Sequence, residues 1–406
     1  MNAPRIMVPA VLALCLSAAS SAWSQVTVQL RGGAPDRVVA AAVALDRGLE
    51  VRVVQPGKPE VREVLPWDEV RGVIDASGRA SGRASASEFV AIAEDLWRAR
   101  IRVARNDAAL AKPLLAKHWD RLRGEDGPTA QLMAEGLLRA ALEEGDLVAA
   151  AGPWIECLRL GIDGTPTRFP ALPPMLDDST GLLPGLAPFA PSEMRDALAK
   201  ALESAAASTR KSGAAAGSAS DVAASVAALM ARLLDASGGA PSAASAPSAA
   251  SAPAGDAPAI RALGAVEAIA TAADARARER AVAEFDRRYP EPPAFLAAWR
   301  LAAIGAASAR EARAAAPGDR SAALLRAALD NLAVPASGLD KTGLVDAYAI
   351  EVAEALTREA GDTAAAAALA SLKAERLRDA AVKFGPAPAP AGGAANDGGA
   401  RGTTRS

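Results

Sequence analysis

The sequence contains few of the side chains that catalytic and metal sites use. Its 406 residues include one histidine, two cysteines and two tyrosines, and aromatic residues make up only 3%. Most zinc sites and cysteine–histidine catalytic pairs need several of these groups close together. No glycine-rich loop has the spacing of a phosphate-binding site either. We therefore expect no catalytic residue, no metal ligand and no cofactor.

No charge of either sign predominates. The formal net charge is -2 at pH 7, and acidic and basic residues are interleaved without a basic stripe, so nucleic acid is not an expected partner. Hydrophobic residues make up 51% of the chain, and alanine supplies much of this fraction. Because alanine buries little area per residue, we expect thin, local cores rather than one large core.

Residues 1–24 have the pattern of an export signal. Arg5 is the positive end, residues 6–19 are apolar, and small residues precede Gln25. The apolar stretch is too short to span a bilayer comfortably, so an uncleaved anchor is the weaker alternative and no stable transmembrane span is expected after cleavage. We predict an exported protein that is periplasmic, envelope-associated or secreted.

Removal of this signal deletes Cys15, which follows Leu14 and so lacks the small preceding residue that a lipid attachment site requires. Cys157 then remains as the single thiol, and no internal disulfide can form. Its position between Ile155 and Leu158 on an expected helix favours a buried thiol, with an intermolecular disulfide as the alternative.

Residues 25–75 differ from the rest of the chain. Apolar residues alternate at Val26 and Val28 and again at Leu49 and Val51, and glycine and proline separate the runs. This pattern predicts a compact antiparallel β-domain of four or five strands. It resembles the small SH3-like barrels that precede helical regions in many exported bacterial proteins. Residues 76–87, with a repeated Ser-Gly-Arg-Ala, are expected to be a linker that ends in a capping box at Ser85.

Four short turns separate alanine- and leucine-rich stretches of helical spacing. They are Asn106-Asp107, Gly145-Asp146, Gly318-Asp319 and Gly361-Asp362. Glycine or asparagine can end a helix in the left-handed conformation, and the following aspartate can cap the next helix. The turns therefore predict antiparallel helical hairpins.

The expected fold class is α+β and mostly α, with the helices in two blocks. Residues 88–203 form a helical-hairpin domain with a proline-rich insertion at 161–191, whose apolar content predicts an ordered wrap across the helices. Residues 204–259 are predicted to be a disordered low-complexity linker, interrupted at most by one helix at 221–234. A second helical domain at 260–384 and a disordered tail at 385–406 follow.

The helical parts resemble tetratricopeptide-type repeat proteins. In that family a small residue follows the turn glycine by five positions, as Ala111, Ala150, Ala323 and Ala366 do here. The turns lie about 39 and 43 residues apart, against about 34 in the family, so the resemblance concerns topology rather than a regular superhelix. It implies a protein or peptide partner bound on a concave helical face.

Few other residues suggest chemistry. His118 lies on an apolar helix face and is expected to be a packing histidine. The segments 208–211 and 341–343 match two motifs of penicillin-recognising enzymes, but they fall in a linker and at a helix start. Asp177 and Asp178 could attract a cation, and a solvated turn is the favoured interpretation.

Trp97, Trp119 and Trp154 fall in the first helical block and are candidates for partner binding, although filling the core is the favoured role. The predicted function is an exported, non-catalytic protein-interaction or scaffold protein of the bacterial periplasm or envelope. The alternative is an enzyme of unknown class with its site at the junction of the β-domain and the helices, near Trp67, Asp68 and Trp97.

Overall fold

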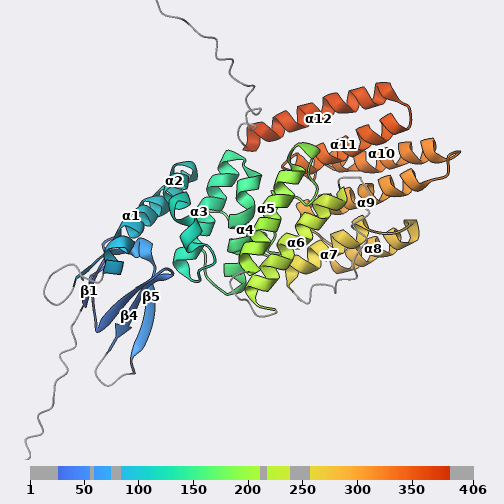
Figure 1. The fold of residues 1–406 in the computed structure, drawn as a ribbon. Coiled ribbons are helices and arrows are strands. Elements are labelled where there is room, and N and C mark those ends of the chain that lie inside the picture. Colours follow the sequence, from blue (N-terminus) through green and yellow to red (C-terminus); the bar gives the residue numbers. More distant parts are fainter. Residues whose placement is uncertain (1–25, 55–58, 75–83, 211–216, 238–256, 385–406) are drawn as a thin grey trace, which may run out of the picture.

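The computed structural model describes residues 26–54, 59–74, 84–210, 217–237 and 257–384. This part of the chain consists of a small antiparallel β-domain followed by helices packed one after another, as the sequence predicts. The β-domain lies at one end of the molecule and the last helices lie at the other (Figure 1). The predicted signal at 1–24 and the predicted tail at 385–406 lie outside the described residues.

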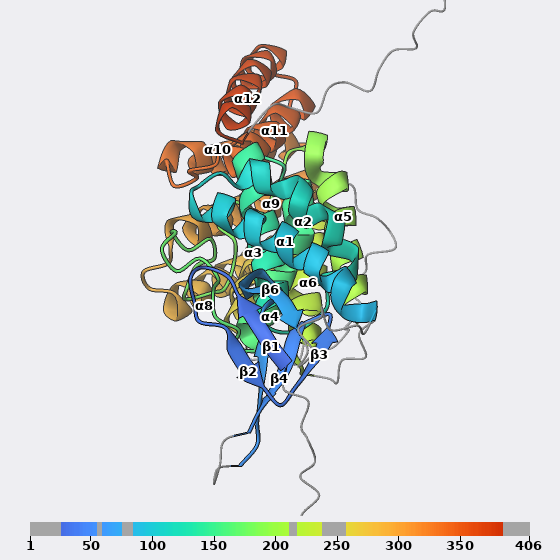
Figure 2. The same cartoon turned by 90° about the vertical axis from the view of Figure 1, so that its left-hand side faces the viewer.

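The β-domain contains two three-stranded sheets, ordered β2-β1-β6 and β3-β4-β5. Their strands are β1 (Val26–Leu30), β2 (Arg37–Val39), β3 (Ala41–Leu45), β4 (Gly48–Val53), β5 (Val61–Leu65) and β6 (Val70–Ile74), with the short 3-10 helix η1 (Trp67–Glu69) before β6. Only Ala40 separates β2 from β3, and its N–H donates to the Arg52 carbonyl, so one bent strand serves both sheets. Alternation places Val28 and Val51 in the core between them, where Trp67 of η1 is also buried. Figure 2 views the molecule from this end.

Twelve helices follow within the described residues. They are α1 (Ala84–Ala104), α2 (Ala108–Leu122), α3 (Pro128–Glu144), α4 (Leu147–Ile162), α5 (Ser192–Arg210), α6 (Ala219–Ser237), α7 (Pro258–Ala270), α8 (Ala275–Arg288), α9 (Ala294–Ala314), α10 (Arg320–Ser337), α11 (Leu344–Glu359) and α12 (Thr363–Phe384). Consecutive helices pack in pairs, which is the predicted hairpin arrangement. Helix α1 begins inside the predicted linker, so Ser85 lies within it rather than capping it.

Three of the four predicted turns contain a left-handed residue. Asn106 has a φ of 60°, Gly145 of 72° and Gly361 of 94°. Asp146 caps α4 by accepting the Ala149 N–H at 2.9 Å. Each turn of this kind reverses the chain and satisfies backbone groups that the helix ends leave open.

Only one of the other three predicted aspartate caps forms. Asp362 accepts the Ala365 N–H at 2.9 Å, but Asp107 and Asp319 precede their helices without a side-chain cap bond. Helix α9 ends at Ala314, four residues before Gly318, and Gly318 has no positive φ. Gly318 and Asp319 therefore lie in the turn between α9 and α10, but this turn is not formed by a left-handed glycine.

The predicted low-complexity linker at 204–259 contains the one helix that it allowed at 221–234, and the described helices extend further into it than predicted. Residues 219–237 form helix α6, which packs against α4, α5 and α7, and α5 itself continues to Arg210. The valine, leucine and methionine residues among the alanines of α6 recur at helical spacing, and Val226, Met230 and Leu234 are fully buried. Residues 211–216 and 238–256 of the predicted linker lie outside the described residues.

The helices share one large core and two smaller ones, not only thin local cores. The largest runs from α3 to α11, a second joins the β-domain to α1–α3, and a third lies between α9, α10 and α11. The described helices therefore do not separate into two independent blocks. Close packing of small residues over many helices gives a continuous core even though each alanine contributes little area.

The proline-rich segment between α4 and α5 is ordered, as its apolar content predicts. Phe169, Leu182, Leu183, Leu186 and Phe189 are all buried. Phe189 packs against Tyr348 of α11 with ring centroids 5.4 Å apart. The segment therefore connects helices that are far apart in the sequence.

Two Gly-Asp turns allow a matched test of the left-handed turn. We expect Gly361→Ala to lower the free energy of unfolding by about 1 kcal/mol, because an L side chain is strained at a φ of 94°. Gly318→Ala, which also meets open space but has no positive φ, should leave stability unchanged or raise it by about 0.4–1 kcal/mol. Urea denaturation measures both, and equal effects would contradict the assignment.

Candidate functional site

The three tryptophans do not form one surface. Trp154 is 1% exposed in the core of α4, so it is not available to a partner. Trp119 is partly buried and packs against both of the larger cores, and the Arg31 guanidinium lies 4.9 Å from the ring centre of Trp97. No ring contact joins them among the described residues. Trp154 therefore fills space between alanine-rich helices, which is the role that the sequence favoured.

The junction of the β-domain and the helices is a packed contact. Trp67 stacks on Phe89 of α1 with ring centroids 4.7 Å apart, and its indole N–H donates to the Leu45 carbonyl at 2.9 Å. Both Trp67 and Asp68 are 0% exposed. Their burial leaves no open face at this point of the junction, where the sequence suggested an enzyme site.

Asp68 is neutralised from two directions. Its Oδ2 accepts hydrogen bonds from Arg100 of α1 and from Arg168 of the proline-rich segment, each at 2.9 Å. Its Oδ1 is buried without a hydrogen-bond partner. Burying a carboxylate is costly unless it is paired, so the folded state requires both arginines beside Asp68. This ionic cluster fastens the β-domain to both segments.

Glu135 of α3 performs a similar role for the start of the proline-rich segment. Its carboxylate accepts the Thr167 hydroxyl and the Arg168 N–H, each at 3.0 Å, and Glu135 is 5% exposed. Glu135 is not among the residues that the sequence pattern predicts. The one available signal was a glutamate on the apolar face of an otherwise alanine- and leucine-rich helix.

His118 is a packing histidine with an acidic partner. It is 8% exposed, and its Nε2 lies 2.8 Å from the Asp95 Oδ2, which also accepts the Lys117 ammonium at 2.9 Å. Burial of Asp95 acts against its ionised form, but the hydrogen bonds from Lys117 and His118 outweigh it and hold the pKa of Asp95 below its usual range. The arrangement ties α1 to α2 and includes no nucleophile.

Cys157 is a buried free thiol. It is 3% exposed, and its burial, with Glu135 and Glu156 nearby, raises the pKa of the thiol well above its usual value. The thiolate needed for disulfide exchange is therefore scarce, and a partner cannot reach the sulfur in the folded chain. The geometry supports the buried structural thiol over an intermolecular disulfide.

The remaining polar candidates are also used within the chain. Asp177 Oδ1 accepts the hydroxyls of Ser179 and Thr180 at 2.6 and 2.8 Å. Ser208 lies in α5 and donates to the Ser204 carbonyl, and Lys341 lies in the turn before α11, so neither has the setting of a penicillin-recognising site. The described ranges contain no group of three side chains suited to holding a metal ion.

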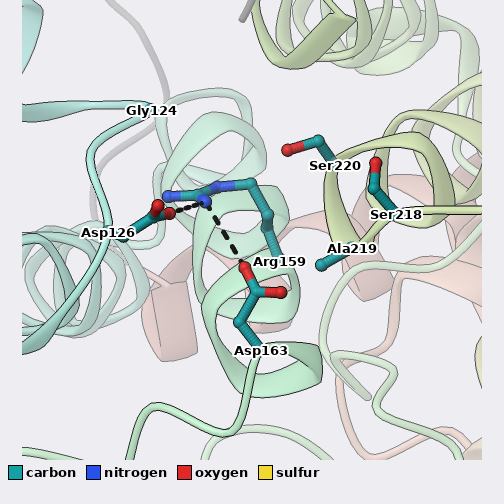
Figure 3. Close-up of a pocket in the computed structure, with 7 residues that line it drawn as sticks. All are labelled: Gly124, Asp126, Arg159, Asp163, Ser218, Ala219 and Ser220. Atoms are coloured by element: carbon teal, nitrogen blue, oxygen red, sulfur yellow. Dashed lines mark hydrogen bonds and ion pairs between the residues drawn. The ribbon is translucent and has the colours of Figure 1, made fainter. Parts of the chain in front are cut away.

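A polar cavity of about 190 Å³ opens between α4, the loop after α2 and the start of α6, as Figure 3 shows. Arg159 crosses it, 2.6 Å from Asp126, 2.7 Å from Glu156 and 3.6 Å from Asp163. Burial opposes its charge, but Glu156 and Asp126 outweigh this and raise the pKa of Arg159. Because acids surround this arginine, the cavity offers a ligand no uncompensated positive charge.

No protein-family model, curated protein sequence or solved structure is significantly similar to this chain. Among the described helices, none combines the length and the apolar character needed to cross a membrane. The arguments about function therefore rest on the geometry of this chain.

The ionic cluster at Asp68 is testable by removing its charge. Asp68→Asn removes the buried carboxylate that Arg100 and Arg168 share and leaves them only the more exposed Glu69. We expect the free energy of unfolding to fall by about 3 kcal/mol, the lower end of the range for a broken buried pair, because Arg100 is 38% exposed and Glu69 remains. Glu63→Gln breaks the exposed Arg37–Glu63 pair of the same domain and should cost less than about 1 kcal/mol. Urea denaturation followed by tryptophan fluorescence compares them. Similar losses for both variants would show that Asp68 is not a fastening residue.

The depressed pKa of Asp95 predicts a pH dependence with a defined sign. The ionised form stabilises the folded chain above the unfolded pKa of about 3.9, and this contribution disappears as the pH falls through the lower folded pKa. The stability difference between the wild type and Asp95→Asn should therefore be largest above about pH 5 and shrink below about pH 4. Asp120→Asn, at a side chain that is 90% exposed, is the control and should show little difference at any pH. A constant Asp95 effect from neutral to acid pH would refute the linkage.

Proposed function

We propose that this protein is an exported, non-catalytic interaction or scaffold protein of the bacterial periplasm or envelope. It binds a protein or peptide partner through the surfaces of its helix pairs. The observation that carries the proposal is the use of its reactive side chains: His118, Cys157 and Asp68 are buried in packing or in ion pairs. What the fold presents outward is helical surface.

Two resemblances support this function. The helix pairs, reversed by left-handed residues at Asn106, Gly145 and Gly361, are similar in topology to tetratricopeptide-type repeats. The two three-stranded sheets share a bent strand at Ala40 and have η1 before the last strand, as in small SH3-like barrels. Both kinds of module serve in protein contacts, and neither requires catalytic residues.

Helix α10 carries the most exposed apolar side chain of the described residues. Leu329 is 68% exposed and Leu325, one helical turn before it, is 39% exposed. Ala322 and Ala333 are exposed on the same face, which lengthens the apolar stripe. Exposed apolar patches of this kind mark protein contacts, so we assign this face of α10 as a partner surface for apolar side chains.

The test uses the full chain, tagged at its C-terminus and produced in the organism that encodes it, with crosslinking in living cells. We expect the mature chain to begin at Gln25, to appear in the periplasmic or envelope fraction, and to crosslink to a specific protein. The pair of substitutions Leu325→Glu and Leu329→Glu should remove that crosslink. Because both side chains are exposed, stability should change by no more than about 0.5 kcal/mol.

The pair of substitutions Ala364→Glu and Ala368→Glu is the matched control, since it adds the same two charges one helical turn apart at exposed positions of α12. It should leave the crosslink intact. Retention of an uncleaved chain in the cytoplasm would overturn the proposed export. Identical crosslinks from all variants would exclude the α10 face as the partner surface.

A further inference from the structure

A second cavity, of about 90 Å³, lies between α5, α6, α9 and α11. Its apolar lining consists of four alanines and Val352, and its polar lining comes from Arg195, Ser237, Arg310, Arg313, Tyr348 and Glu351. Three arginines around one small space are unusual, because each positive charge needs an acidic partner or a bound anion when it is removed from water.

The charges of the surrounding network balance without Arg310. Glu351 accepts the Arg195 guanidinium at 3.1 Å and the Lys373 ammonium at 3.3 Å, and Lys373 also reaches Glu193 at 3.1 Å. These two cations and two anions cancel. The network also joins the start of α5 to α11 and α12.

The other two arginines differ from one another. The Arg313 guanidinium pairs with Glu359 at 2.7 Å. Arg310 instead donates to the carbonyls of Ala270 and Ala272, and within the described residues no carboxylate lies within ion-pair distance of it. The neighbouring Glu311 is already paired with Arg278 at 2.6 Å. The cavity therefore has one uncompensated positive charge.

Tyr348 supplies a second donor. Its side chain is 1% exposed and lines the cavity. The hydroxyl is not one of the fully buried polar atoms without a partner, which fits a hydroxyl that faces the cavity and can donate to a group bound there. Phe189 holds the ring in place, so the hydroxyl has a fixed position.

We propose that this cavity binds a single carboxylate group, with Arg310 and Tyr348 as its donors. Guanidinium groups bind carboxylates through charge-assisted, often bidentate hydrogen bonds. One excess positive charge matches one carboxylate. The volume is well below the roughly 300–1,000 Å³ of a pocket that encloses a whole drug-sized ligand. It therefore suits a small carboxylic acid or the carboxylate end of a peptide, and this site is separate from the partner surface on α10.

The experiment is isothermal titration calorimetry on the full chain at constant ionic strength. The probes are acetate, N-acetyl-dialanine, N-acetyl-dialanine amide and inorganic phosphate, with chloride as the background anion. We expect saturable binding of both carboxylates. Tighter binding of acetate would indicate a small acid as the ligand, and tighter binding of N-acetyl-dialanine would indicate a peptide C-terminus. The amide should not bind.

Arg310→Gln should weaken carboxylate binding by roughly tenfold or more, and Tyr348→Phe should weaken it by roughly fivefold, because each removes one donor. Tyr348→Phe keeps the ring on Phe189, so it tests the site even where Arg310→Gln disturbs folding. Arg326→Gln, at an exposed arginine of α10, is the matched control and should bind like the wild type.

Several results would overturn the proposal. Wild-type protein that shows no saturable binding above chloride would mean that the cavity holds only water. Unchanged affinity in both cavity variants would place the binding elsewhere. Tighter binding of phosphate than of either carboxylate, or equal binding of the peptide amide, would contradict the assignment of a carboxylate. The crosslinking test concerns residues of α10, which do not line this cavity. A negative crosslinking result would therefore leave the carboxylate proposal standing, and the reverse also holds.

Discussion

Close approach of helices with small side chains is the constraint on which the rest of this structure depends. An alanine buries so little area that a helix gains stability only where its neighbour comes near. At Gly305 of α9 an added Cβ would lie 2.4 Å from Asn331 of α10, and at Gly136 of α3 it would lie 2.5 Å from Leu115 of α2. The fully buried Asn331 donates through its Nδ2 to the Gly305 carbonyl at 3.1 Å, while its Oδ1 has no hydrogen-bond partner, so close packing here leaves one polar atom unsatisfied.

Neighbouring helices pack through such contacts, but distant parts of the chain are joined by longer side chains. The proline-rich segment between α4 and α5 provides several of these links. Arg168 holds the β-domain through Asp68, Thr167 donates to Glu135 of α3, and Phe189 packs on α11. Irregular backbone suits this role because it can cross several helices without forming a regular ladder of its own, while its side chains fill the core.

This organisation explains why the few reactive side chains serve structure. A buried acid or base between alanine-rich helices is stable only when a partner neutralises it, so most ionisable groups end in pairs such as Asp95 with His118 and Lys117. Arg310 departs from this rule, since it donates to backbone carbonyls and lines the smaller cavity. A scaffold that contacts partners through helix faces can also carry a specific anion site, because the two use different surfaces.

The sequence by itself determined the antiparallel hairpins, the β-domain and the buried wrap. These follow from short-range rules: left-handed glycine or asparagine ends a helix, alternation makes strands, and apolar residues in a proline-rich stretch require burial. Only the tertiary structure decided that α6 belongs to the core and that Asp68, Glu135 and Glu351 are fastening points. It also placed Arg310 beside Tyr348, 38 residues later. Composition cannot separate a packed alanine helix from a linker, because the difference lies in which neighbours cover it. Charge pairing likewise depends on residues a hundred or more positions apart, as for Asp68 with Arg168 and Arg195 with Glu351.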